Sequence, residues 1–301
     1  MAQQLQEAYA NVLEFDALGD GSGDQTANIQ SAIDSGRHVL FPAGTYAISG
    51  CLTFPHDDQR CRFLAGAILQ PQTKSAYVLI TGDRQVIEGL RVEPKSGVAA
   101  HSPLVEIYAA NELVLEDLRV SIPTWPTATN PILRSAVRVQ GTDTCTFIGG
   151  RISGSSESTT VGLWLTDYPP PSSLPTPGAL ARISATGFEI REFGWALRID
   201  CDVDGVTLIG CALLNNVDGS VNVRSYGSGD QNPEVASLCL VDCRMAGSDP
   251  DQYLRVAEGC SWTGGVVAGC IFDELTAEGS RSPQRRGSRP WATGEPRTGS
   301  L

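Results

Sequence analysis

Alternating runs of apolar and polar residues return along this chain at irregular intervals. Each copy of the pattern holds two short runs joined by a polar turn, as in LVEIYAANELVLEDLRV from Leu104 to Val120. Intervals of 32, 26, 34, 24 and 33 positions separate the equivalent residues Ile107, Val139, Leu165, Ile199, Val223 and Val256. Alternation of this kind indicates β-strands, and helical repeats keep a stricter period. The pattern therefore predicts a β-solenoid, a stack of β-coils with turns of variable length.

The second run of each copy carries two apolar columns. The first consists of Leu90, Leu118, Gly150, Phe188, Cys211, Cys243 and Cys270, and the second, two positions later, of Val92, Val120, Ile152, Ile190, Leu213, Met245 and Phe272. Residues two apart lie on one face of a strand, so stacked coils would align both columns toward the interior. Three stacked cysteines could form a disulfide or bind a metal, but a buried thiol also packs as a small hydrophobic group. We interpret these cysteines as free thiols.

Composition limits the classes of protein to which the chain can belong. Hydrophobic residues make up 41% and charged residues 19% of the 301 residues, so a core can be buried. The formal charge of −12 argues against nucleic-acid binding, which needs a basic face. No apolar run is long enough for a membrane span. The first residues, MAQQLQEAYANV, lack the basic start and apolar core of a signal peptide, so we expect the nine cysteines to stay reduced in a cytoplasm.

One short helix is predicted near the start, within FDALGDGSGDQTANIQSAIDSG. Its apolar stripe consists of Ile29, Ala32 and Ile33. Ser22 or Asp24 can cap its first turn, and Gly36 can end it in the left-handed conformation. The open end of a solenoid exposes backbone and core groups that need a cover. We therefore expect a helix over residues 24–35 to plug this end, with its apolar stripe facing the first coil.

Residues 12–49 carry a motif composed of a loop rich in glycine and aspartate, a helix and a strand. The residues that carry it are Phe15, Ala17, Gly19, Asp20, Gly21, Asp24, Thr26, Ile29, Gln30, Ala32, Ile33, Phe41, Pro42, Gly44, Thr45 and Tyr46. The motif resembles the opening of the pectate-lyase-like right-handed β-helix superfamily, and more closely its branch of bacteriophage tail spikes. Asp16, Gln25 and Asn28 depart from the usual residues. The resemblance implies an all-β fold, a single-stranded right-handed parallel β-helix with a short N-terminal capping helix.

This motif identifies a fold and leaves the reaction open. Members of the superfamily include lyases, hydrolases, epimerases and adhesins without activity. The polygalacturonase type needs Gly-His-Gly and Arg-x-Lys motifs on successive coils, and neither occurs in the coil region. Asp16, Asp20 and Asp24 lack the alternate spacing of a calcium loop, so we interpret them as turn and cap residues. We expect neither a metal site nor a cofactor.

A polar column is predicted on the outside of the solenoid, along the first run of each copy. Its outward residues are Glu106, Arg138, Trp164, Arg198, Asn222 and Arg255, and the next outward position holds Tyr108, Gln140, Thr166, Asp200, Arg224 and Ala257. Stacked coils would place neighbours about 4.8 Å apart. Arginine binds carboxylates in a bidentate manner and an indole stacks on a sugar ring, so the column is a candidate track for an acidic sugar chain. The alternative is an ordinary solvated face.

Two long turns follow this column and could wall a cleft. They run from Thr166 to Ala179 and from Ser225 to Pro233, on either side of a short turn that holds Asp200, Asp202 and Asp204. Glycoside hydrolysis uses two close carboxylates, so Asp200 and Asp202 are candidate catalytic residues, with ordinary turn aspartates as the alternative. A third insertion carries Trp125 and leaves from another corner. The candidate carbohydrate-binding residues are Arg138, Trp164, Arg198, Asn222, Arg224, Asp167 and Asp230.

The predicted domains are an N-terminal docking or flexible segment (1–11), the β-helix (12–279) and a flexible basic tail (280–301). In the first segment, Leu5 and Tyr9 could belong to one short helix or to a frayed terminus. The tail carries five arginines and one glutamate and has no apolar periodicity.

With the resemblance, these features predict a phage-type virion spike, on the tail or the head, that binds bacterial surface or capsular polysaccharide for host adhesion. The resemblance also implies a homotrimer in the virion, with the N-terminal segment contacting other virion proteins. One alternative is a polysaccharide depolymerase, a glycoside hydrolase or lyase on the same β-helix. Another is a structural virion connector that binds protein only.

Overall fold

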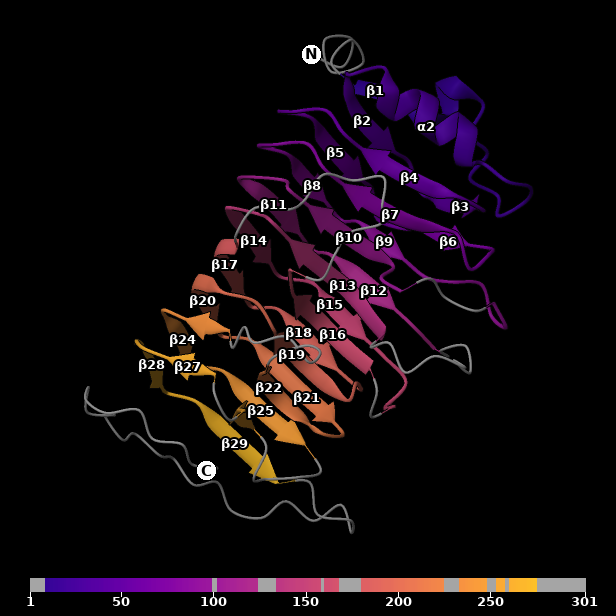
Figure 1. Cartoon of the computed structure of the whole chain (residues 1–301). Helices are drawn as coiled ribbons and strands as arrows, with labels where there is room; N and C mark the ends of the chain where they lie inside the picture. Colours follow the sequence, from indigo (N-terminus) through magenta and orange to yellow (C-terminus); the bar gives the residue numbers. More distant parts are fainter. Residues whose placement is uncertain are drawn as a thin grey trace.

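The computed structural model describes residues 9–98, 102–123, 134–157, 160–167, 180–224, 233–247, 253–257 and 260–274. Within these ranges the strands stack coil upon coil into three parallel sheets along one axis (Figure 1). The chain passes through the sheets in turn, so that each complete coil adds to all three. This architecture confirms the predicted all-β, right-handed parallel β-helix.

We name the three sheets A, B and C. Sheet A consists of β1 (Tyr9–Asn11), β2 (His38–Phe41), β5 (Arg60–Phe63), β8 (Val86–Glu88), β11 (Leu113–Glu116), β14 (Thr144–Ile148), β17 (Leu180–Thr186), β20 (Val203–Ile209), β23 (Glu234–Val235), β24 (Leu238–Val241), β27 (Ser261–Trp262) and β28 (Gly265–Ala268). Sheet B consists of β3 (Gly44–Ile48), β6 (Ala67–Pro71), β9 (Arg91–Val92), β12 (Arg119–Ser121), β15 (Arg151–Ser153), β18 (Glu189–Arg191), β21 (Ala212–Asn216), β25 (Arg244–Gly247) and β29 (Ile271–Glu274). Sheet C consists of β4 (Cys51–Phe54), β7 (Tyr77–Ile80), β10 (Val105–Tyr108), β13 (Arg134–Gln140), β16 (Thr160–Leu165), β19 (Trp195–Ile199), β22 (Gly219–Val223) and β26 (Leu254–Val256).

The repeat that the sequence predicts corresponds to the successive coils of the structure. Neighbouring strands of sheet C pair in parallel and in register through Ile107, Val139, Leu165, Ile199, Val223 and Val256, the residues that defined the intervals. The intervals between these residues vary because the segments that connect the strands differ in length, and the strands of sheet C stay in register.

Each coil has three strands, whereas the sequence pattern suggested two. A residue in the left-handed conformation breaks the second run of each copy, so that its two halves join sheets A and B. These corner residues, each directly before a member of the first apolar column, are Gly89, Asp117, Gly149, Gly187, Gly210, Asp242 and Gly269. Glycine adopts positive φ without steric cost, and aspartate tolerates it better than most residues. Both columns face the interior as predicted: Leu118 and Val120 are each 1% exposed.

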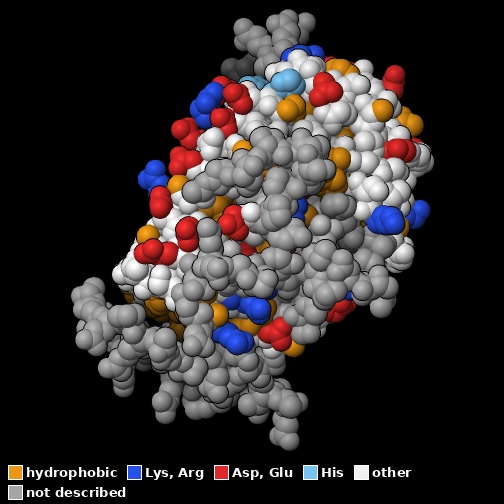
Figure 2. All heavy atoms as spheres, viewed as in Figure 1, with side chains coloured by type: hydrophobic (Ala, Val, Ile, Leu, Met, Phe, Trp, Pro, Cys, Tyr) orange, Lys and Arg blue, Asp and Glu red, His pale blue; other side chains and the backbone are white. Residues whose placement is uncertain are grey.

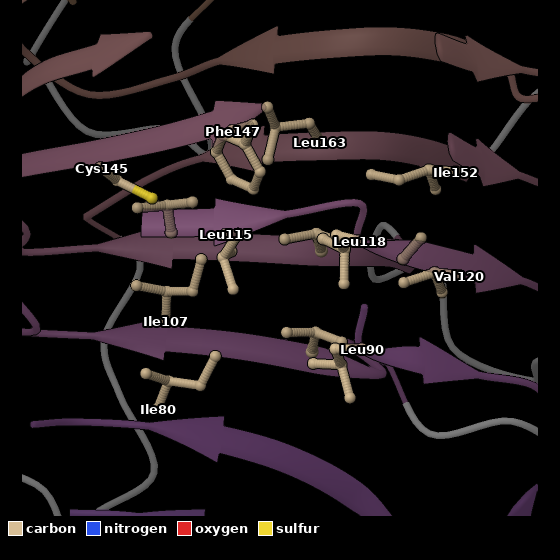
Figure 3. Packing of buried hydrophobic residues seen from close by; sticks show 14 of the residues in the cluster. Ile80, Leu90, Ile107, Leu115, Leu118, Val120, Cys145, Phe147, Ile152 and Leu163 are labelled. Carbon is tan, nitrogen blue, oxygen red and sulfur yellow. The ribbon is translucent and has the colours of Figure 1, made fainter. Parts of the chain in front are cut away.

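Apolar side chains from all three sheets fill the interior (Figure 3). Ile107 comes from sheet C, Leu115 and Phe147 from sheet A, and Ile152 from sheet B, and all four are fully buried. Burial of apolar surface contributes roughly 25 cal/mol per Å². Because each coil packs mainly on its neighbours, the fold is stabilised by repeated local ladders.

Helix α2 (Thr26–Asp34) closes the N-terminal end of the solenoid, at the indigo end of Figure 1. Its buried residues are the predicted stripe of Ile29, Ala32 and Ile33. The Asp24 carboxylate accepts hydrogen bonds from the N–H groups of Thr26 (3.0 Å) and Ser49 (3.1 Å), which confirms its capping role and ties the helix to the first coil. Asp20 accepts the N–H of Ser22 (2.8 Å), as a turn residue does.

The chain enters this cap through a short 3-10 helix, η1 (Val12–Phe15). Tyr9 lies in strand β1, which pairs with β2 at the first edge of sheet A. The sequence had suggested a docking helix or a frayed end here; the strand instead places Tyr9–Asn11 within the β-helix. The basic tail, Trp125, Asp230 and residues 168–179 and 225–232 of the predicted cleft walls lie outside the described residues.

Cys211, Cys243 and Cys270 are free thiols, which confirms the interpretation of the cysteine column. Cys211, Cys243 and Cys270 stack at the corner between sheets A and B, and the thiol of Cys243 donates to the Leu208 carbonyl (3.3 Å). Among the described helices, none has the length and apolar character that a membrane crossing requires.

Candidate functional site

The outward polar column of sheet C is aligned strand by strand, as predicted. Its register joins, in order, Glu106, Arg138, Trp164, Arg198, Asn222 and Arg255. The residues at the next outward position, which include Asp200 and Arg224, stay aligned from coil to coil although they lie just beyond the ends of the strands. The N–H of Asp200 bonds to the Leu165 carbonyl (3.1 Å), and that of Arg224 bonds to the Ile199 carbonyl (2.9 Å). The structure therefore brings five of the predicted binding residues, and Asp200, onto one face.

This face is buried, whereas the sequence analysis predicted a solvent-facing track. Only 1% of Trp164, 2% of Arg198 and 1% of Asn222 is exposed. The expectation was wrong because alternation shows which side chains leave the core and does not show whether they reach water. Arg224 and Asp167, in contrast, are exposed.

A buried cluster forms around Asp200 at the end of β19. The indole N–H of Trp164 donates to Asp200 Oδ1 (2.6 Å), and Nε of Arg198 donates to Oδ2 (3.3 Å). The Arg198 guanidinium carbon lies 5.9 Å from the centroid of the Trp164 ring. The two side chains that the sequence offered to a ligand are thus engaged with the aspartate beside them.

The Asp200 carboxyl has an altered acidity. Burial raises its pKa to about 6, although the Arg198 guanidinium and the hydrogen bonds from Trp164 and Thr166 act in the opposite direction. The negative charge of Asp167 adds to the rise in pKa. A carboxyl with this pKa can hold or release a proton near neutral pH, which acid–base chemistry requires.

A second buried ion pair lies earlier in the column, between β10 and β13. Nε of Arg138 donates to Glu106 Oε1 (3.1 Å), and the side chain of Glu106 is 1% exposed. Burial and the nearby Glu106 charge both raise the pKa of Tyr108. The buried carboxylate of Glu106 and the buried guanidinium of Arg198 therefore each have a partner of opposite charge, as a charge removed from water requires.

Several neutral polar groups on this face have no hydrogen-bond partner among the described residues. They are both amide atoms of Asn222, the hydroxyl of Ser220 and the hydroxyl of Tyr108, in side chains that are at most 2% exposed. Buried polar groups are nearly always paired in native proteins, and an unpaired one costs about 1–3 kcal/mol. The face thus carries unused hydrogen-bonding capacity.

Asp202, the other candidate catalytic residue, lies at the exposed corner between sheets C and A. Its Oδ1 accepts the backbone N–H of Glu234 on the next coil (2.8 Å). Earlier coils repeat this contact: Asp57 accepts the N–H of Asp83 (2.9 Å), and Asp83 accepts that of Asn111 (2.8 Å). Figure 2 shows several acidic side chains along the left edge of the molecule. Asp202 thus stabilises a corner, and its catalytic role stays a prediction.

The candidate residues chosen from the sequence did not include Glu106, Ser220 or Tyr108. A signal for Glu106 existed, because aligned copies place it opposite Arg138, and opposite charges in that position stabilise neighbouring strands. Ser220 and Tyr108 had the right alternation to face outward, but nothing in the sequence marked their hydroxyls as unpaired. In the described ranges, no group of three or more His, Cys, Asp or Glu side chains could hold a metal ion.

The first coils are similar to a known protein family. The family model described as rhamnogalacturonase A/epimerase, pectate lyase-like, matches residues 9–84. Mannuronan C5-epimerase AlgE3 of Azotobacter vinelandii is 53% identical over 45 residues, which cover 13% of this chain and 2% of AlgE3. The matched stretch spans only 2–4% of the curated relatives.

Solved structures extend the likeness over most of the chain. PfbA, a surface adhesin of Streptococcus pneumoniae, has a TM-score of 0.51 at 12% identity, covering 90% of this chain and 80% of PfbA. A pectate lyase from Xanthomonas campestris has a TM-score of 0.50 at 10% identity, covering 93% of this chain and 86% of the lyase. At such identities the likeness shows the fold alone. Together with the family match over residues 9–84, it supports the pectate-lyase-like right-handed β-helix fold for this chain.

Proposed function

We propose that this chain recognises a polysaccharide on the outer face of sheet C, as part of a phage-type virion spike that attaches to a bacterial surface. The observation that carries the proposal is the aligned column of Trp164, Arg198 and Asn222, with hydrogen-bonding groups left unpaired beside it. An indole ring, a guanidinium and an amide are side chains that bind sugars well. Their regular spacing along the axis suits a polymer better than a single small molecule.

The comparisons support recognition without specifying its target. One neighbour with the same fold is named a surface adhesin and another a pectate lyase. The phage-type assignment rests on the loop, helix and strand motif of residues 12–49. A homotrimer in the virion, with contacts to other virion proteins through the N-terminal segment, completes the proposal.

Binding can be tested with a panel of purified bacterial capsule polysaccharides and the full chain. Light scattering after size-exclusion chromatography should show a complex that contains polysaccharide of unchanged mass. Asn222→Ala should weaken this complex, because it removes the unpaired amide without disturbing an ion pair. Thr207→Ala, on the outer face of sheet A, is the matched control and should bind as the unaltered chain does. No complex with any polysaccharide would refute recognition.

Cleavage of a polysaccharide is the second candidate function, and the raised pKa of Asp200 favours it. A buried carboxyl that keeps its proton near pH 6 fits the general acid of a glycosidase or lyase. The second carboxylate would be Asp202, as the sequence suggested, or Asp167, whose charge acts on Asp200. Polysaccharide that elutes at smaller mass after incubation would establish cleavage. Asp200→Asn should then abolish the change in mass and keep binding.

The connector alternative makes a different prediction. A protein that only joins virion components should bind no sugar and should need residues 1–11 for assembly. Removal of residues 1–8 leaves strand β1 in place and separates assembly from the fold.

A further inference from the structure

We infer that the ligand of the sheet C face is an uncharged glycan rich in hydroxyl groups, and not the acidic sugar chain that the arginines suggest. This inference rests on the proposed recognition of a polysaccharide and specifies its chemical class. It follows from which polar groups of the face already have partners and which do not.

Arg198, which is buried, and Arg138, which is partly buried, already bind a carboxylate. Arg138 donates to Glu106, and Arg198 donates to Asp200. A ligand carboxylate that displaced the partner of either arginine would leave Glu106 or Asp200 as a buried charge without a counter-charge. Such a loss is strongly unfavourable. The arginines therefore order the face and are poor sites for an acidic sugar.

The unpaired groups on the same face are all neutral. The Asn222 amide offers one acceptor and a donor group, and the hydroxyls of Ser220 and Tyr108 can both donate and accept. A carboxylate can only accept hydrogen bonds, so it cannot satisfy Oδ1 of Asn222. Sugar hydroxyls both donate and accept, and two adjacent hydroxyls can satisfy both amide atoms. The unused capacity thus matches the hydroxyl groups of a sugar, and none of it requires a carboxylate.

Longer-range charge also opposes an acidic polymer. The chain carries a net charge of −12, which repels polyanions. Arg224 and Arg255 are exposed on the same side of the sheet, where water and salt screen them. The indole N–H of Trp164 is used by Asp200, so this side chain offers a ligand no free donor.

The test compares neutral polysaccharides (dextran, mannan and uncharged bacterial capsules) with acidic ones (polygalacturonate, alginate, hyaluronate and uronic-acid capsules). We expect the full chain to bind a neutral polymer. Its affinity should change by less than about twofold between about 0.01 M and about 0.15 M ionic strength, because no charge pair is formed. Binding confined to acidic polymers and weakened by salt would overturn the inference and leave polysaccharide recognition standing. Binding to neither group would overturn both.

Two variants locate the contact. Ser220→Ala and Asn222→Ala should each weaken binding of the neutral polymer by about tenfold, the effect of one lost hydrogen bond. Ser220→Ala removes a hydroxyl without a described partner, so it leaves folding intact; Thr207→Ala on sheet A is again the control. Unchanged affinity in both variants, with a neutral polymer bound, would contradict the assignment of this face.

Discussion

The Asp200 carboxyl should make the stability of this β-helix depend on pH. Burial raises its pKa from the ordinary value of 3.8 to about 6. The folded state therefore binds the proton more tightly than the unfolded chain. The stabilising contribution of protonation is complete below pH 3.8 and is lost as the pH rises through about 6. A difference of about 2 pKa units corresponds to about 3 kcal/mol, of which about 2.4 kcal/mol falls between about pH 4 and about pH 7.

Asp200→Asn isolates this effect. The amide keeps the shape of the side chain and an acceptor for the Trp164 N–H, but it does not titrate. It also leaves Arg198 without a buried counter-charge, a cost that does not depend on pH in this range. We would measure the free energy of unfolding in urea by circular dichroism at several pH values. The stability of the wild-type chain relative to the variant should fall by about 2.4 kcal/mol from about pH 4 to about pH 7.

The test depends on how the difference in unfolding free energy between wild type and Asp200→Asn changes with pH. The cost of the unpaired Arg198 is the same at every pH and therefore does not affect that change. Thr207→Ala, which changes no titrating group, should follow the wild-type profile. A difference in unfolding free energy between wild type and Asp200→Asn that stays constant with pH would refute the reasoning. So would a wild type whose stability relative to the variant increases as the pH rises. Either result would mean that pairing with Arg198 outweighs the burial of the carboxyl.

Three further predictions concern the same cluster and the scaffold. Trp164→Phe removes a hydrogen bond that favours the charged carboxylate, so the midpoint of the pH profile should move above pH 6; an unchanged midpoint would contradict this contact. Gly150→Ala places a Cβ against the Leu118 carbonyl oxygen at φ +92°, so it should lower the free energy of unfolding, measured by thermal unfolding, by several kcal/mol. Gly187→Ala has open space around the new Cβ at φ +62° and should lower it by only about 1 kcal/mol. Ile33→Ala in the capping helix should cost about 2–5 kcal/mol in urea unfolding.

The register of the solenoid could be predicted from the sequence because inward positions tolerate few residue types. Ile107, Val139 and Leu165 pair as the repeat suggested. The corner between sheets A and B was missed because an alternating run continues across it without a change of period. Gly89 and Asp117 held the missing signal, since both adopt positive φ directly before an inward residue.

The sequence predicted where the residues of the candidate site lie on sheet C, but it did not predict that they are buried. Alternation places Trp164 and Arg198 on one outward column, and the structure confirms that alignment. Their burial could not be read from the strands, because exposure depends on what lies over a face rather than on the periodicity within it. The same limit applied to Asp200 and Asp202, which are two residues apart: one enters the buried face, and the other turns to the corner and accepts a backbone N–H.

The positions of the carboxylates favour recognition over hydrolysis. Glycoside hydrolysis needs two carboxyl groups about 5–9.5 Å apart. Glu106 belongs to the column of Arg198 but lies three strands away, which is about 14 Å at the spacing of parallel strands. Asp202 is engaged at the corner, so Asp167 is the remaining described carboxylate near Asp200, and its charge does act on the Asp200 pKa. A hydrolase on this face would depend on that one pair, whereas recognition can use every neutral group of the column.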